Sequence, residues 1–110
     1  MKRKKVNYKL NVLLKTPHGY KYKEVRALEE SSMFNHALVL HAQAGKYDNL
    51  NKYCVSEKSS GARVACADSK DETWEKAVNR INFHGKAEYL NSIKEFLDLI
   101  SNLKESGELK

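Results

Sequence analysis

The spacing of apolar residues changes near position 68, and this change constrains the fold more than any other feature of the sequence. Before it, apolar and polar residues alternate in short runs, which is the period of a half-buried β-strand. After it, apolar residues recur every three or four positions, as in an amphipathic helix. A chain of 110 residues holds one domain with one core. We therefore expect a single α+β domain over residues 1–110, with strands first and helices last.

The first strands are predicted to form a β-hairpin. Residues 5–15 alternate at first, and residues 20–26 alternate aromatic and charged side chains. The segment Thr16-Pro17-His18-Gly19 lies between them and is typical of a turn, because proline presets an early φ and glycine accepts a positive φ. The apolar side of the first strand is Val6, Tyr8, Leu10, Val12 and Leu14.

The middle of the chain is harder to assign. Residues 29–35 are expected to be a polar break between elements. Residues 36–43 fit either a helix capped by Ser32 or a short buried strand over 36–42, and we favour the strand. Residues 52–58 and 62–67 form a second predicted hairpin around the turn Ser59-Ser60-Gly61. The expected sheet is thus antiparallel and built from two hairpins, with a possible further strand at 36–42.

The last 41 residues are predicted to form two helices packed on one face of the sheet. Ser69 and Glu72 have the spacing of a capping box at the start of the first helix, and Gly85 is suited to end it. The second helix is expected over residues 86–103, with residues 1–4 and 105–110 frayed. We expect the apolar side of the first strand, with Val55 and Val64, to meet a helical stripe of Trp74, Ile81, Leu90, Ile93 and Leu97.

The segment KYCVSEKSSGARVACADSKDETWEKAV, residues 52–78, combines a turn glycine, small residues and a helix cap. In these features it resembles a β-β-α module of small phage and mobile-element proteins of unknown function. The resemblance covers about a quarter of the chain. It implies a phage or mobile-element origin and a β-β-α fold element, but no activity.

The location and the redox state of the thiols are predicted together. The basic start Met1–Lys5 is not followed by an apolar stretch, and the longest apolar run is Ala37–Leu40, so we expect neither a signal peptide nor a membrane span. A cytoplasmic protein is the resulting expectation. In that compartment thiols stay reduced, so we expect Cys54 and Cys66 to be unbridged, although they lie roughly opposite each other in the second hairpin.

Positive charge is concentrated at the start of the chain. Residues 1–28 carry nine Lys or Arg and one acidic residue, whereas residues 68–110 carry seven basic and nine acidic residues. Such an asymmetry favours an anionic partner near the first hairpin, either nucleic acid or an acidic protein surface. A solubilising basic face without a ligand is the alternative interpretation.

The favoured function is nucleic-acid binding by the first hairpin, because Lys and Arg neutralise phosphates and exposed tyrosines stack on bases. The candidate contacts are Lys5, Lys9, Lys15, Lys21, Lys23, Arg26, Tyr20 and Tyr22, together with Lys2, Arg3 and Lys4 of the basic start. Alternation places the lysines at 21 and 23 on one face and the two tyrosines on the other. Packing of the tyrosines under the helices is therefore the competing interpretation.

A second hypothesis is an accessory or inhibitory protein, of phage or mobile-element origin, that binds host or defence proteins. The last helix is a possible homodimer contact through Phe96 or Leu99. The sequence contains no signature of an enzyme, metal site or cofactor site, so we expect none of the three. His18 is interpreted as a turn residue, and the spacing of His36 from His41 matches no metal-ligand pattern.

Overall fold

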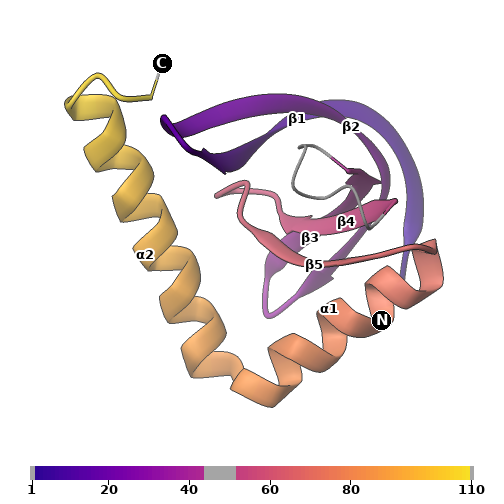
Figure 1. Ribbon diagram of the computed structural model, residues 1–110. Coiled ribbons are helices and arrows are strands. Elements are labelled where there is room, and N and C mark those ends of the chain that lie inside the picture. The colour runs from indigo at the N-terminus through magenta and orange to yellow at the C-terminus, as the bar shows by residue number, and fades with distance from the viewer. Residues whose placement is uncertain (1, 44–51, 110) are drawn as a thin grey trace.

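The computed structural model describes residues 2–43 and 52–109, which form five strands followed by two helices (Figure 1). The strands are β1 (Lys4–Thr16), β2 (Gly19–Met33), β3 (His36–Ala42), β4 (Tyr53–Glu57) and β5 (Arg63–Ala67), and the helices are α1 (Lys70–His84) and α2 (Lys86–Glu105). The predicted α+β class, the strand at 36–42 and the two C-terminal helices are confirmed. The sheet is one antiparallel meander in the order β1-β2-β3-β4-β5, rather than two hairpins, because β3 pairs with a strand on each side.

The polar break predicted over residues 29–35 is wrong, since β2 continues to Met33. Its polar residues find partners in the folded chain: Glu29 accepts a hydrogen bond of 2.8 Å from Trp74 Nε1, and the Ser31 hydroxyl donates one of 2.7 Å to the Lys2 carbonyl. The reversal to β3 is confined to Phe34 and Asn35, which have φ of 53° and 67°. Two consecutive positive φ values are typical of the tight turns that fit the twist of a hairpin.

The β1–β2 hairpin arches over the other strands, so the sheet has a concave inner face and a convex outer face (Figure 1). Val12 and Leu14 on the inner face are 0% and 6% exposed, and they cluster with Leu10 and Val25. The arch is held at its open side by the turn after β4, where the Leu13 amide donates to the Gly61 carbonyl at 3.1 Å. Val12 and Leu14 are thus buried within the arch rather than under the helices.

The main core lies between the outer face of the sheet and the helices. It contains Leu38, Leu40, Val55, Ala65, Trp74, Ala77, Ile81, Tyr89 and Ile93, with Val64 and Leu90 packed against it. The predicted helical stripe is therefore largely present, but its partners are β3, β4 and β5 rather than β1. Leu97, which we expected in this stripe, is 41% exposed.

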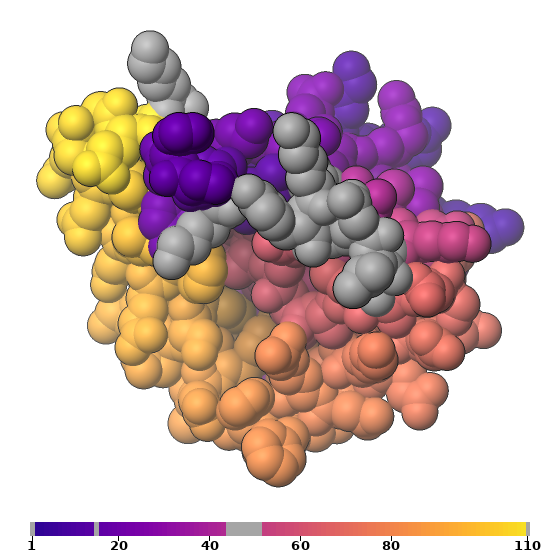
Figure 2. Space-filling view, in the orientation of Figure 1, coloured from indigo at the N-terminus to yellow at the C-terminus, as the bar shows by residue number. Residues whose placement is uncertain are grey.

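The C-terminal half of α2 docks on the tip of the first hairpin (Figures 1 and 2). Leu13 on the outer face of β1 forms a second cluster with Ile100, Leu103 and Leu109, and all four are at most 7% exposed. The segment after α2, which we expected to be frayed, turns back so that the Leu109 amide donates to the Leu103 carbonyl at 3.2 Å. Burial of a single leucine explains the turn, because it removes apolar surface from water.

Cys54 and Cys66 are joined by a disulfide, contrary to the expectation of free thiols. The two residues are direct partners in the β4–β5 register, and their Cα atoms are 4.0 Å apart. Cys54 is fully buried. The expectation relied on the reducing environment of the cytoplasm, whereas the strand register places the two side chains side by side.

Both helices start where the sequence indicates and α1 ends there too, whereas α2 continues past the predicted residue 103 to Glu105. The Ser69 hydroxyl accepts a hydrogen bond of 3.2 Å from the Glu72 amide at the start of α1. Gly85 ends α1 with φ 85° and leads directly into α2, so the two helices meet at a corner (Figure 1). Within residues 2–43 and 52–109, neither helix is long and apolar enough to cross a membrane.

Candidate nucleic-acid interface

The register of the first hairpin separates the lysines from the tyrosines, as the alternation indicated. Lys21 and Lys23 lie opposite Leu14 and Val12 and therefore share the inner face of the arch. Tyr20 and Tyr22 point to the outer face. A single ligand therefore reaches both sets only around the edge or tip of the hairpin.

The tyrosines serve as packing residues in this fold. Both are half-buried and pack against the cluster that Leu13 forms with α2. The ammonium of Lys104 lies 5.9 Å from the centre of the Tyr22 ring, on the helix side. The geometry thus favours the packing interpretation of the tyrosines over base stacking.

Three cations near the start of the chain, Arg3, Lys4 and Lys9, are paired with carboxylates. Arg3 lies 2.9 Å from Asp71 and 3.9 Å from Glu29. Two further pairs are Lys4 with Glu30 at 3.8 Å and Lys9 with Glu24 at 3.5 Å. Exposed pairs of this kind contribute little to stability, but they cancel charge that would attract an anion.

Lys5 and Arg26 lie on the outer face of the hairpin. Arg26 donates a hydrogen bond to the side-chain oxygen of Asn7, a neutral group, and remains exposed. Lys5 is exposed and lies opposite Glu29 in the strand register. Of these two cations, Arg26 is the one without an acid opposite it, since its register partner is Lys9.

The outer half of the hairpin, residues 14–23, presents Lys21 and Lys23 to solvent. Neither forms an ion pair with any residue that the structure describes, and no acidic residue occurs in this stretch. The side chain of Lys15 lies outside the described part of the chain. His18 is exposed at the tip, where its amide donates to the Thr16 hydroxyl at 3.2 Å, as befits a turn residue.

A polar network at the other end of the hairpin escaped the sequence analysis. Tyr8 donates a hydrogen bond to the Glu30 carboxylate, and the Lys58 ammonium lies 3.3 Å from the same group and 4.5 Å from the Tyr8 ring. The hydrogen bond from Tyr8 and the Lys58 ammonium lower the pKa of Glu30, although burial opposes them. These residues are 22 and 28 positions apart, so no local pattern signals their contact.

A buried histidine–serine pair lies on β3 and β4. His41 Nε2 is 2.8 Å from the Ser56 hydroxyl, and Nδ1 is 2.7 Å from the Ala42 carbonyl, to which it donates a hydrogen bond. Both side chains are 0% exposed, which keeps the hydroxyl away from solvent. Among the described residues, no three His, Cys, Asp or Glu side chains are grouped to hold a metal ion.

The fold defines a class rather than a family: a small α+β domain with a five-stranded meander, a helical pair and a long basic hairpin. No protein-family model, no curated protein and no solved structure matches the chain. Function is therefore inferred from the charges and contacts of the interface itself.

Proposed function

We propose that the protein binds nucleic acid through the outer half of the β1–β2 hairpin. Lys21 and Lys23 serve as phosphate contacts there, and Arg26 extends the basic surface around the strand edge. The observation that supports this most is a contrast in charge pairing: the cations near the start of the chain face carboxylates, whereas Lys21 and Lys23 face none among the described residues. An uncompensated ammonium attracts phosphates and releases their counterions on binding.

Binding of this kind contacts the phosphate backbone of the nucleic acid and recognises little of its base sequence. The hairpin presents flexible lysines, while its tyrosine rings are held against α2 and are not available for stacking on bases. Phosphate contacts position a ligand without reading its bases. Binding is therefore expected to depend strongly on salt and weakly on sequence.

The test is fluorescence anisotropy with labelled single- and double-stranded DNA and RNA at about 50 and about 200 mM salt. We expect the double variant K21A/K23A to weaken binding about tenfold at low salt and to reduce the salt slope by about two, one per lost contact. The matched control is K4A/K9A, which removes two lysines of the same hairpin that are already paired with acids. It is expected to change affinity by less than about threefold.

Two results would contradict the proposal. One is the absence of binding to every nucleic acid at low salt. The other is equal weakening by K4A/K9A and K21A/K23A, since that would show a dependence on net charge rather than on the outer half of the hairpin.

A second candidate function, protein binding, is favoured by one observation. Phe83 at the corner between the helices is 86% exposed, whereas Phe96 and Leu99, the residues expected to offer a dimer contact, pack against the cluster around Leu13. Exposed aromatic residues are common anchors of protein interfaces. A partner that survives nuclease treatment and is lost with F83A, but retained with the charge variant K21A/K23A, would favour this function over the first.

A further inference from the structure

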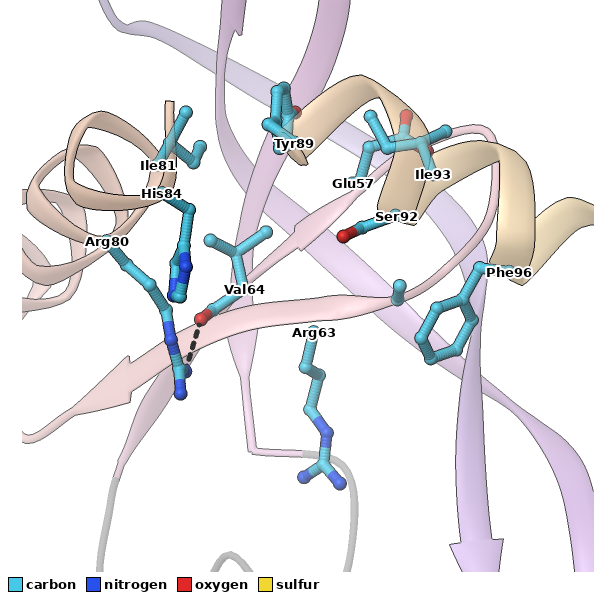
Figure 3. A pocket seen from close by; sticks show the side chains of 11 residues that line it. Glu57, Arg63, Val64, Arg80, Ile81, His84, Tyr89, Ser92, Ile93 and Phe96 are labelled. Carbon is cyan, nitrogen blue, oxygen red and sulfur yellow. Dashed lines mark hydrogen bonds between the residues drawn. The ribbon is translucent and has the colours of Figure 1, made fainter. Parts of the chain in front are cut away.

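A cavity of about 310 Å³ lies between α1, α2 and the start of β5, away from the basic hairpin (Figure 3). Its walls come from the last turns of α1, the first half of α2 and residues 62–64. The volume falls at the lower end of the range that small-molecule sites occupy. The cavity lies where α2 departs from α1 at Gly85 and passes the start of β5 on its way to the hairpin tip.

The inside of the cavity is mostly apolar. Ile81 and Ile93 form the side nearest the main core, and Phe96 closes the end towards the hairpin (Figure 3). Val64 lies across from Ser92, whose hydroxyl points into the space between β5 and α2 (Figure 3). An apolar wall with a few polar groups is the usual composition of a site for a small organic molecule.

The rim of the cavity is basic. Arg80 donates a hydrogen bond of 2.8 Å to the Val64 carbonyl, which fixes its guanidinium at the mouth (Figure 3). Arg80 forms no ion pair with the residues that the structure describes, so its charge is not cancelled there. His84 also lines the rim and lies 3.3 Å from Glu88. A guanidinium that is held in place and has spare N–H donors suits a carboxylate, sulfate or phosphate.

Glu57 is the acidic residue among the described residues of the lining, and it is hydrogen-bonded within its own turn. Its carboxylate accepts hydrogen bonds from the Ser59 amide and hydroxyl and from the Ser60 amide, and the residue is 1% exposed. The neighbouring Tyr89 hydroxyl is buried and has no hydrogen-bond partner among the described residues. Burial, helped by the Glu57 charge, raises the pKa of Tyr89 to about 12, so this hydroxyl remains a donor at neutral pH.

From these groups we infer that the cavity binds a small organic anion with an apolar or aromatic body. The body packs against Ile81, Ile93 and Phe96, and the acid group pairs with Arg80 at the mouth. This site includes neither Lys21 nor Lys23 and goes beyond nucleic-acid binding.

The test uses anilinonaphthalene sulfonate, an aromatic anion whose fluorescence rises on binding, and its uncharged analogue phenylnaphthylamine. We expect saturable binding of the anion at one site and binding of the uncharged analogue that is about tenfold weaker. R80Q removes the charge and is expected to weaken binding of the anion about tenfold, but not binding of the uncharged analogue. S92F fills the cavity and is expected to abolish binding of both dyes.

Each variant has a matched control outside the cavity. K76Q removes one charge from α1, and S101F adds the same ring to an exposed position of α2, so neither should change dye binding. Thermal unfolding of each variant verifies that it is folded. The inference is overturned if S92F and S101F bind alike, if R80Q and K76Q weaken binding alike, or if the two dyes bind the unaltered protein equally.

Discussion

The amide of Leu13 and the carbonyl of Gly61 are joined by a hydrogen bond of 3.1 Å, which connects β1 to the turn between β4 and β5. These segments belong to opposite ends of the strand order, so the bond closes the arch of the sheet. Gly61 has φ +71°, and a Cβ placed on it would lie 2.8 Å from the Asn11 carbonyl oxygen. Only glycine allows the two backbones to approach this closely.

We predict that G61A lowers the free energy of unfolding by at least about 2 kcal/mol, because it adds backbone strain and a backbone clash. The control is G19A at the hairpin tip, where φ is +112° but no atom lies within 4 Å of an added Cβ. This control is expected to lose about 1 kcal/mol from strain alone. Urea unfolding measures both variants. Equal losses would show that the contact with β1 is unimportant.

Glu57 is a buried carboxylate that holds the same turn through Ser59 and Ser60. E57Q keeps the shape but places an N–H group where an oxygen accepted hydrogen bonds. We expect it to lower the free energy of unfolding by about 2–3 kcal/mol, as for a lost charged acceptor with a buried donor left unpaired. Chemical denaturation of E57Q beside E105Q, a change at an exposed residue, measures the effect. A loss below about 0.5 kcal/mol would contradict the structural role.

We expect Glu30 to make the unfolding free energy of the protein depend on pH in the acid range. Its pKa is lowered from 4.5 by the hydrogen bond from Tyr8 and by the Lys58 and Lys4 ammonium groups. The folded protein therefore prefers the charged carboxylate, and this contribution is present above the ordinary pKa and lost as pH falls through the folded value. We expect the difference in unfolding free energy between the unaltered protein and E30Q to shrink from pH 7 to about pH 3.

The cause of this dependence is tested with Y8F, which removes the hydrogen bond that lowers the Glu30 pKa most. We expect the loss of unfolding free energy caused by E30Q to depend less on pH when it is measured in Y8F than in the unaltered protein. Urea unfolding at several pH values provides the data. An E30Q difference that stays constant from neutral to acid pH would contradict the assignment.

The Cys54–Cys66 bridge is predicted to stabilise the β4–β5 pair. It closes a short loop, for which loss of the bridge costs about 3 kcal/mol. We expect thiol titration of the denatured, unreduced protein to find no free thiol, and reduction to lower the midpoint of urea unfolding. C54A/C66A is the control for other effects of the reductant. Because it has no disulfide, its urea midpoint should not change on reduction. Two titratable thiols in the unreduced protein would contradict the bridge.

Local patterns in the sequence were sufficient to predict the elements that are stabilised by interactions between residues close in sequence. Alternation located β1 and the start of β2, and Ser69 and Gly85 located the ends of α1. The segment 29–35 was misassigned as a break because the partners of its polar residues, such as Trp74, are distant in sequence. The candidate site shows the same limit: the cations were identified, but their pairing with Asp71, Glu30 and Glu24 was not.

The sequence by itself determined the α+β class, the order of strands before helices and the surplus of positive charge in the first 28 residues, because hydrophobic period and charge are properties of local composition. Only the tertiary structure decided how the sheet arches, which leucine of β1 meets α2 and which cations stay free. Those outcomes depend on contacts such as Leu13 with Ile100 and Arg3 with Asp71, between residues 87 and 68 positions apart. Contacts between residues so far apart produce no periodic pattern in the sequence.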